Sequence, residues 1–434
     1  MRRKKKISGR KEEQGIILTL VAVFMLGVVG AMAALAIDVV SLYTARSEAQ
    51  LAADAAALAG ARVLANSGMT SNPTDATLMT NAENLARTIA TRVAMNNEVG
   101  GRTLLSGEVT VTFNNTSPTN PRVTVKTGRT DLPTFFARIW GNSALAVAAT
   151  ATAEAYNPSG AATPPLTGPI TPVAPTCVKP WVLPNIDPTL PGNQIFDPTT
   201  GAIQNSALLT WDGSTQRMWA RCQNCTSGSP TPLLWRYYAG APASFPAPSA
   251  SSVVCTGSGG FTGYQLRVAG CIQTPIACNS TVSIDMSNYA NRDEETTDAV
   301  NCLTHSTAAA NDGDSIDTAS VPPPPPFQFL AGADNPVVQA GAVAAGTDIV
   351  VSDSLVTVPV YNSTGAVPTS PVTIIGFVQL FLNPDGLGVP NGPPNEDHIL
   401  TRIVNLAGCG TGATGQPILG NGASPVPVRL ISPP

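Results

Sequence analysis

The sequence of 434 residues is poor in charge, in aromatic side chains and in histidine. Charged residues make up 12% of it, aromatic residues 5%, and His305 and His398 are its two histidines. Catalytic triads and most zinc sites use histidine, so two isolated histidines leave few ways to build either. Gly-x-Ser-x-Gly, His-Glu-x-x-His and phosphate-loop motifs are also absent. These absences argue against the common enzyme classes, but a carboxylate-only hydrolase stays open because paired carboxylates leave no signature.

The few charges are unevenly distributed along the chain. Residues 1–130 carry 15 basic and 9 acidic side chains, whereas residues 131–434 carry 9 basic and 19 acidic ones. The basic excess is concentrated in a short head, residues 1–15, and a basic head of this kind favours anionic lipid headgroups. Nothing after it resembles a nucleic-acid footprint, so no nucleic-acid partner is predicted.

A long apolar run follows the basic head. Residues 16–37 contain no charged side chain. As a helix rising about 1.5 Å per residue, this run is roughly 33 Å long, and the hydrocarbon core of a membrane is about 30 Å thick. A helix also satisfies its own backbone hydrogen bonds in lipid. We therefore predict a transmembrane helix that begins at Ile16 and ends at Ile37, with Asp38 at the membrane interface.

The basic head also predicts the orientation of the span. Basic segments beside a span stay on the cytoplasmic side, so the remaining chain should lie outside the cytoplasm. The alternative is a signal peptide, because Ala34, Leu35 and Ala36 form an A-x-A cleavage pattern that would give a secreted protein. The apolar run is longer than the usual h-region of about 7–15 residues, which favours a retained anchor.

The helical pattern continues beyond Asp38 to about Asn66 as a stalk. This stretch has no proline and is rich in the strong helix formers Ala, Leu, Glu, Gln and Arg. Four small residues lie at helical neighbours and form what we call the packing ridge: Ala53, Ala56, Ala57 and Gly60. So thin a ridge lets another backbone approach closely, either from the same chain or from a neighbouring copy.

The order of these features resembles a known family. Gln14 and Gly15 precede the span, Ala36-Ile37-Asp38-Val39 and Leu42-Tyr43 follow it, and the box AADAAALAGARVLA occupies residues 52–65. This order resembles the N-terminal region of TadG-like proteins of the Tad (tight adherence) Flp-pilus machinery, over roughly residues 10–155. Related pseudopilins are cut after a glycine and carry Glu at the fifth position after the cut. Here that position after Gly15 is Leu20, which favours an uncleaved anchor.

The resemblance implies a function and a location. It implies a non-enzymatic, single-pass protein of a bacterial inner membrane, with its bulk in the periplasm, that helps to assemble or anchor a pilus through protein–protein contacts. Membrane lipid and other pilus-assembly proteins are the implied partners, with self-association through the helix as a further option. No cofactor is expected. An exported, adhesin-like surface-binding module and a periplasmic hydrolase are the alternatives.

The pattern after the stalk predicts an α+β fold. In residues 38–156 a second helix is expected from Thr74 or Asp75 to about Asn97, a hairpin of strands at 108–113 and 122–126, a short helix at 132–140 and a third strand at 144–155. A Pro/Gly-rich linker at 157–176 follows, then a β-rich, cysteine-bearing domain at 177–320 made of short strands and loops. A polyproline strut at 321–326 leads to an all-β domain at 327–434, with strand-like runs at 348–351, 355–361, 372–382 and 399–406.

All eight cysteines lie beyond the span. They are Cys177, Cys222, Cys225, Cys255, Cys271, Cys278, Cys302 and Cys409. An even number outside the cytoplasm predicts disulfides, but eight cysteines allow 105 pairings, so the connectivity stays open. Cys222-x-x-Cys225 would also suit a redox pair or half a zinc site. It lacks both the βαβ context of the first and suitably spaced histidines for the second.

Two turn-like segments carry oxygen ligands that calcium could use. They are residues 311–314, Asn-Asp-Gly-Asp, and residues 383–386, Asn-Pro-Asp-Gly. Neither has the ligand count of a full calcium loop. We therefore predict no metal site, and calcium binding by these loops stays an open question at this point.

Overall fold

The computed structural model describes residues 10–117, 119–134, 136, 141, 144–159, 173–187, 193–204, 216–220, 234–253, 255, 258–286, 293–306, 312–317, 328–363, 368–389, 399–409, 418–419 and 424–431. The fold is α+β, as predicted. It divides into two compact units, which are described separately. The first comprises Met1–Ala56, Thr91–Val111 and Val125–Ala151, and the second comprises Ala57–Ala90, Thr112–Thr124 and Thr152–Pro434.

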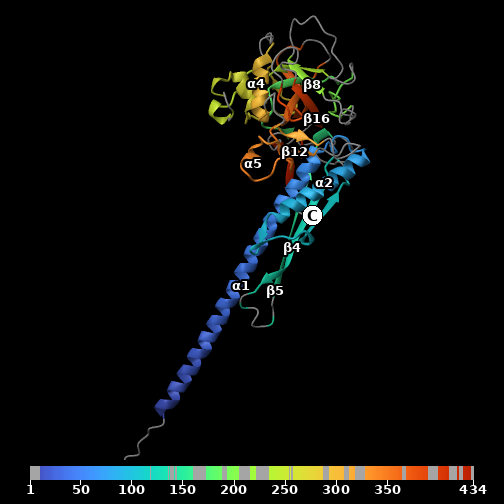
Figure 1. Ribbon diagram of the computed structural model, residues 1–434. Helices are drawn as coiled ribbons and strands as arrows, with labels where there is room; N and C mark the ends of the chain where they lie inside the picture. The colour runs from blue at the N-terminus through green and yellow to red at the C-terminus, as the bar shows by residue number, and fades with distance from the viewer. Residues whose placement is uncertain are drawn as a thin grey trace, which may run out of the picture. The chain divides into compact units, whose positions relative to one another are not determined.

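Two helices open the chain. Helix α1 runs without interruption over Arg10–Asn66, the long blue ribbon in Figure 1, and contributes residues to both units. Helix α2 spans Ala76–Met95, within one residue or two of the predicted range. The Asp75 carboxylate accepts the backbone N–H groups of Thr77 and Leu78 at 3.0 and 2.9 Å. Asp75 is therefore the N-cap that starts α2.

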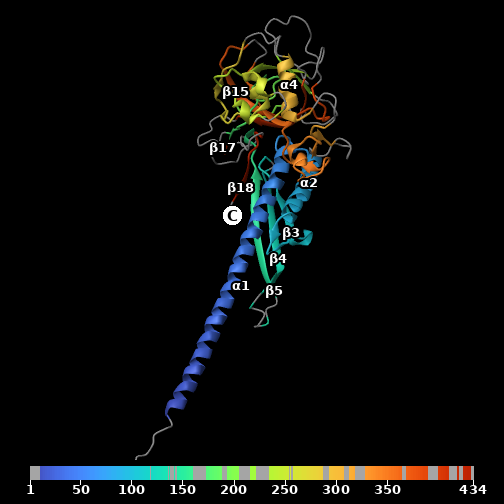
Figure 2. The ribbon, with the colours of Figure 1, turned by 60° about the vertical axis from the view of Figure 1, so that its left-hand side comes forward.

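The predicted hairpin and third strand belong to a four-stranded sheet in the order β18-β5-β4-β3 (Figure 2). The strands are β3 (Val109–Asn114), β4 (Arg122–Pro133), β5 (Ala144–Ala155) and β18 (Val428–Ile431). The short helix predicted at 132–140 is wrong at its start, because Leu132 and Pro133 continue β4 with Leu132 on its buried side. Residues 135 and 137–140 lie outside the described residues.

The second unit contains a seven-stranded sheet in the order β10-β15-β14-β7-β9-β8-β16. Its strands are β7 (Trp181–Pro184), β8 (Gln216–Ala220), β9 (Leu234–Ala239), β10 (Thr281–Val282), β14 (Leu355–Tyr361), β15 (Val372–Leu382) and β16 (Ile399–Gly408). Because β15 pairs with both β14 and β16, the pairings form a closed ring, to which β10 adds at the start of β15. One sheet thus takes strands from both segments, 177–320 and 327–434, that the sequence suggests as separate domains.

Two helices in the cysteine-bearing segment differ from the strands and loops predicted there. They are α3 (Gly263–Ala269) and α4 (Asp293–Thr304), and they pack against each other. Thr262 caps α3 in a capping box: its hydroxyl accepts the N–H of Gln265, whose side-chain oxygen accepts the N–H of Thr262. Trp181 of β7 donates to the Tyr264 hydroxyl at 3.1 Å, which joins α3 to the core of the ring.

The remaining elements of the described residues are short. They are β1 (Glu98–Val99), β2 (Arg102–Thr103), β6 (Val173–Ala174), β11 (Ser315–Ile316), β12 (Phe329–Leu330), β13 (Asp348–Ile349), β17 (Ile418–Leu419), α5 (Pro336–Gln339) and three 3-10 turns at Ser106–Glu108, Ala250–Ser252 and Ser258–Gly260. Strand β6 pairs with β17, and β11, β12 and β13 form a small sheet.

Buried polar side chains join the end of α1 to the ring of strands. The Asn405 amide of β16 donates to the carbonyl of Ala65, and its oxygen accepts the hydroxyl of Ser71 at 2.7 Å. The Asn157 amide donates to the same hydroxyl at 3.2 Å and to the carbonyl of Leu406 at 2.9 Å. These groups are buried, so each hydrogen bond replaces one that water would otherwise make.

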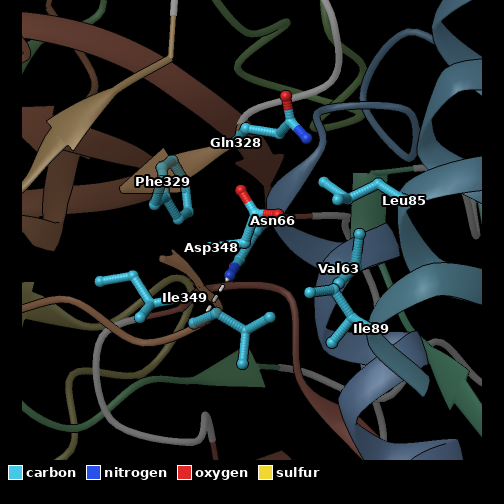
Figure 3. A pocket seen from close by; sticks show the side chains of 9 residues that line it. Val63, Asn66, Leu85, Ile89, Gln328, Phe329, Asp348 and Ile349 are labelled. Atoms are coloured by element: carbon cyan, nitrogen blue, oxygen red, sulfur yellow. Dashed lines mark hydrogen bonds between the residues drawn. The ribbon is translucent and has the colours of Figure 1, made fainter. Parts of the chain in front are cut away.

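A small gap at this junction, which Asn66, Val63, Ile89 and Phe329 help to line, is too small to be a ligand site (Figure 3). Its volume is about 10 Å³, close to the space that a single water needs. The Asn66 amide donates across it to the carbonyl of Val350 at 3.0 Å. The gap is therefore a packing detail of the second unit.

Candidate functional site: the anchor helix

The N-terminal part of α1 exposes nearly all of its apolar side chains. Leu18, Leu26 and Met32 are 74%, 76% and 70% exposed, and Phe24 and Leu35 are also exposed. Surfaces of this kind are avoided on soluble monomers and mark contact with lipid or another protein. By its length and composition the helix could cross a membrane. This helix fits a single-pass membrane anchor.

Asp38 lies inside α1 and does not end it. Its carboxylate is 4% exposed and accepts the backbone N–H of Phe136 at 3.0 Å. Glu48, further along α1, accepts the N–H of Gly100 at 2.7 Å. Both acids line a cavity of about 340 Å³ in the first unit, and Leu132 of β4 also lines it. Asp38 is therefore a buried hydrogen-bond acceptor for the backbone of Phe136, and its position at the membrane interface stays a prediction.

The packing ridge is buried. Ala53, Ala56 and Ala57 have no exposed surface, and Gly60 is also buried. The buried small face continues toward the span through Ala45, Ala49 and Ala52. In the first unit the Thr127 hydroxyl of β4 donates to the carbonyl of Ala49 at 2.9 Å, which is possible because the side chain there is a methyl group.

At Gly60, in the second unit, β4 and α2 lie very close to the packing ridge. A Cβ atom added at Gly60 would lie 3.1 Å from Val123 Cγ1 of β4, 3.3 Å from Ala90 Cβ of α2 and 3.6 Å from the Ala86 carbonyl oxygen. Carbon atoms in contact are normally about 3.5–4.0 Å apart. The neighbouring strand and helix of the same chain therefore leave little room for any side chain larger than a methyl group at this position.

One family model matches most of the anchor helix, including Asp38 and the packing ridge. Residues 15–63 match the model of the family described as putative Flp pilus-assembly TadE/G-like. These residues form a TadE/G-like segment. The match begins at the glycine before the span and ends three residues after Gly60. Comparison with curated proteins and with solved structures finds no match.

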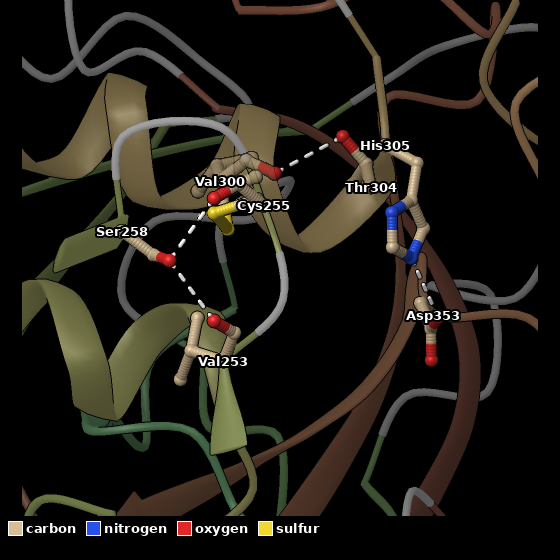
Figure 4. Close-up of a disulfide and its surroundings, with 8 residues drawn as sticks. Val253, Cys255, Ser258, Val300, Thr304, His305 and Asp353 are labelled. Atoms are coloured by element: carbon tan, nitrogen blue, oxygen red, sulfur yellow. Dashed lines mark hydrogen bonds and ion pairs between the residues drawn. A yellow bond between two sulfur atoms is a disulfide. The ribbon is translucent and has the colours of Figure 1, made fainter. Parts of the chain in front are cut away.

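Outside the TadE/G-like segment, the described cysteines are all paired. The disulfides are Cys177–Cys271, Cys255–Cys302 and Cys278–Cys409, and Figure 4 shows the surroundings of the second. The expectation of disulfides is confirmed for these six. Cys222 and Cys225 lie outside the described residues. The sequence could not supply these pairings, because partners are 47 to 131 residues apart.

Asp314, in the first of the two candidate calcium loops, has another role. The Asp314 carboxylate accepts the N–H of Gly332 at 2.8 Å, the amide of Asn335 at 2.9 Å and the hydroxyl of Ser352 at 2.6 Å. Its oxygens thus hold neighbouring loops together. Asn311 lies outside the described residues. Within the described part of the chain, no group of three or more His, Cys, Asp and Glu side chains could hold a metal ion.

Proposed function

We propose that this chain is a non-enzymatic, membrane-anchored component of Flp-pilus assembly or anchoring that acts through protein–protein contacts. One observation carries the proposal: the TadE/G-like match at residues 15–63 includes the part of α1 whose apolar side chains are exposed. A TadE/G-like segment supports a role related to pilus assembly. The exposed apolar length supports insertion of that segment in lipid.

In this proposal residues 1–15 lie in the cytoplasm and the chain from Asp38 onward lies in the periplasm of a bacterial inner membrane. The basic head supports this orientation. The disulfides of the second unit support it independently, because structural disulfides persist in oxidising compartments and are rare in the cytosol.

We also propose that α1 contacts a second copy of the chain. Apolar exposure continues past the span at Val40, Tyr43 and Leu51, which are 63%, 70% and 65% exposed and lie on one helical face. Within the span, a Cβ atom at Gly27 or Gly30 would meet nothing within 4 Å. Small residues of this kind allow close packing of membrane helices.

The topology is tested by the mass of the mature protein. Intact-mass measurement on the membrane fraction should give a chain that retains Lys4, Lys5 and Lys6. A thiol reagent that does not cross the membrane, applied after reduction, should label the cysteines from Cys177 onward in spheroplasts. A mature chain that starts at Ile37 would instead mean a secreted protein and would contradict the anchor.

The role in pilus assembly is tested by deletion and complementation. Deletion should reduce surface pili, and the wild-type gene should restore them. A version in which a cleavable signal peptide replaces residues 1–37 exports the same periplasmic part without an anchor, and it should fail to restore them. Full rescue by this version would refute the anchoring role. Normal pilus number with reduced surface binding would indicate the adhesin-like alternative.

Self-association is tested by cross-linking through one helical face. A Tyr43→Cys variant should give disulfide-linked dimers in membranes under mild oxidation. Ala45→Cys, two residues away and 2% exposed, is the matched control and should not. Equal dimer yields at the two positions would contradict a specific helix contact.

A further inference from the structure

The four-stranded sheet leaves part of one edge open. Strand β5 has twelve residues, and β18 pairs with the last four of them, residues 152–155 (Figure 2). The other eight, residues 144–151, have β4 on one side, and in the described part of the chain no strand pairs on their other side. We call these eight residues the open edge. As an extended strand they span about 27 Å, at about 3.4 Å per residue.

Every second residue of the open edge directs its backbone groups toward the open side. The N–H of Tyr156, just after β5, donates to the carbonyl of Pro427, just before β18, at 3.0 Å. Residues two apart in a strand direct their N–H and C=O groups toward the same neighbour. The backbone groups of Ala146, Ala148 and Thr150 therefore face the side on which β18 lies further along β5.

One of these groups has a weak partner from α1. Gln50 Nε2 lies 3.4 Å from the carbonyl oxygen of Thr150 and 2.8 Å from Asp54 Oδ1. The contact with Thr150 is exposed and is longer than the usual hydrogen bond of about 2.9–3.0 Å. An incoming strand could therefore replace it while Gln50 keeps its bond to Asp54.

The sequence of the open edge does not protect it from pairing. Residues 144–151 read Ala-Leu-Ala-Val-Ala-Ala-Thr-Ala, with no charged residue and no proline. Native proteins commonly place lysine or proline on an edge strand to prevent pairing with other chains. The exposed side chains of Ala146, Ala148 and Thr150 are also small, so they do not hinder a neighbouring strand. An unprotected edge of this length favours pairing with a partner.

A second copy of β5 does not fit this edge in a membrane. In the first unit Asp38 of α1 contacts Phe136 and Gln50 contacts Thr150, so the chain toward β5 runs along α1 away from the span. Two copies anchored in one membrane therefore hold β5 in the same direction. A two-fold axis between them places equal residues opposite each other. A parallel ladder instead needs a residue that faces its neighbour to lie opposite one that does not.

The two faces of the open edge indicate which strand would fit. Val147, Ala149 and Ala151 are at most 7% exposed, whereas Ala146 and Ala148 are exposed. A strand added beside β5 shares these two faces, because side chains alternate across the sheet. It therefore needs apolar side chains at alternate positions. The open edge offers no charge to pair with a charge opposite, so the fitting segment is uncharged.

We propose that the open edge binds an extended segment of another pilus-assembly protein, uncharged and with apolar side chains at alternate positions. The segment adds to the sheet antiparallel to β5 and in line with β18, so it extends a pairing that β18 already makes. In such strand addition, main-chain hydrogen bonds supply affinity and alternate side chains supply specificity. This inference rests on the proposed role in pilus assembly and states how the partner is held.

Hydrogen exchange in native membranes tests the pairing at single amides. Wild-type protein is labelled in membranes from cells that make the whole pilus apparatus, and in membranes from cells that make this chain alone. The amides of Ala146, Ala148 and Thr150 should exchange at least about tenfold more slowly in the first sample. The amides of Val147 and Ala149 point toward β4 and should exchange equally in both.

Two results of the exchange experiment would overturn the inference. Equal exchange of the three outward amides in both samples would show that no partner strand pairs with the open edge. Slow exchange of these amides already in the chain made alone would show that the chain itself or a second copy covers the edge. In either case another protein would not be the occupant.

A proline variant tests whether the pairing matters for pili. Ala148→Pro removes an N–H that faces away from β4, and proline is tolerated in an edge strand at such a position. Complementation of the deletion with this variant should lose most surface pili. Ala148→Ser keeps the N–H and should restore them as the wild type does. Equal melting temperatures of the two variants in micelles would show that both are folded.

The outcome for pili separates this inference from the proposed function. Full rescue by Ala148→Pro would overturn the inference and leave the role in pilus assembly intact. A deletion without effect on pili would refute that role, and the inference with it. The exchange comparison uses wild-type protein, so it decides the question even where Ala148→Pro fails to fold.

Discussion

Replacement of Gly60 by leucine should measure how tightly the packing ridge is held. The change leaves α1 otherwise intact and adds four carbon atoms at a buried position. The first of these would lie 3.1 Å from Val123 Cγ1 and 3.3 Å from Ala90 Cβ, a few tenths of an ångström inside normal contact. The other three have no space unless β4 or α2 moves.

The expected magnitude follows from two opposing terms. Overpacking costs about 1–3 kcal/mol, and the upper value applies here because a strand and a helix both close on the site. Leucine recovers about 0.8 kcal/mol through its higher helix propensity than glycine. The net loss should be about 2 kcal/mol, which lowers the melting temperature by about 3 °C for a unit as large as the second one, at about 2.1 cal/mol/K of unfolding entropy per residue.

Thermal unfolding of full-length protein in micelles, followed by far-ultraviolet circular dichroism, measures this loss. Ser47→Leu is the matched control because Ser47 is exposed on the same helix, and it should change the stability by less than about 0.5 kcal/mol. Gly60→Ala should be near neutral, since its helix gain of about 1 kcal/mol offsets a slight compression. A Gly60→Leu protein that melts with the wild type would refute the packing argument.

Three further outcomes are expected. Asn405→Leu removes the buried amide that accepts the Ser71 hydroxyl and donates to the Ala65 carbonyl, and it should lower the free energy of unfolding by about 1–3 kcal/mol in denaturant titrations; an unchanged midpoint would contradict the network. The pKa of His305 is raised by Asp353, so this ion pair stabilises the fold at low pH and its contribution is lost as pH rises through the folded pKa. The melting temperature of wild type should therefore fall more between about pH 5 and 8 than that of Asp353→Asn, and parallel curves would disprove this coupling. Cys278→Ser removes a disulfide that spans 131 residues and should cost about 2–5 kcal/mol in chemical unfolding, whereas no loss would mean that the bridge is dispensable.

Local sequence patterns predicted much of the fold. The runs at 355–361 and 372–382 correspond to β14 and β15 because continuous β-branched and apolar residues bounded by turns favour buried strands. Helix α3 was missed although Thr262 and Gln265 carry a capping-box spacing, a signal that seven helical residues make easy to overlook. What local patterns could not provide was long-range pairing: the ring closure of β15 with β16, and the disulfide partners.

The anchor helix could be predicted more fully than its surroundings. An uncharged run and small residues at helical spacing specify a span and a thin face from sequence alone. These patterns do not specify which residues cover the thin face, because Ala90 and Val123 lie 30 and 63 residues after Gly60 in the sequence. The buried position of Asp38 also depends on Phe136, far along the chain.

The position of β18 sets an order of events while the chain is being made. Strand β5 ends at Ala155, and its partner Val428 is synthesised roughly 270 residues later. At about 5–20 residues per second, that interval lasts roughly 15–55 s. Throughout it, one edge of β5 presents unpaired backbone groups that any other extended chain can pair with. Each new molecule therefore passes through a stage in which strand exchange with a neighbour competes with completion of its own sheet, and loss of the last few residues would make that stage permanent.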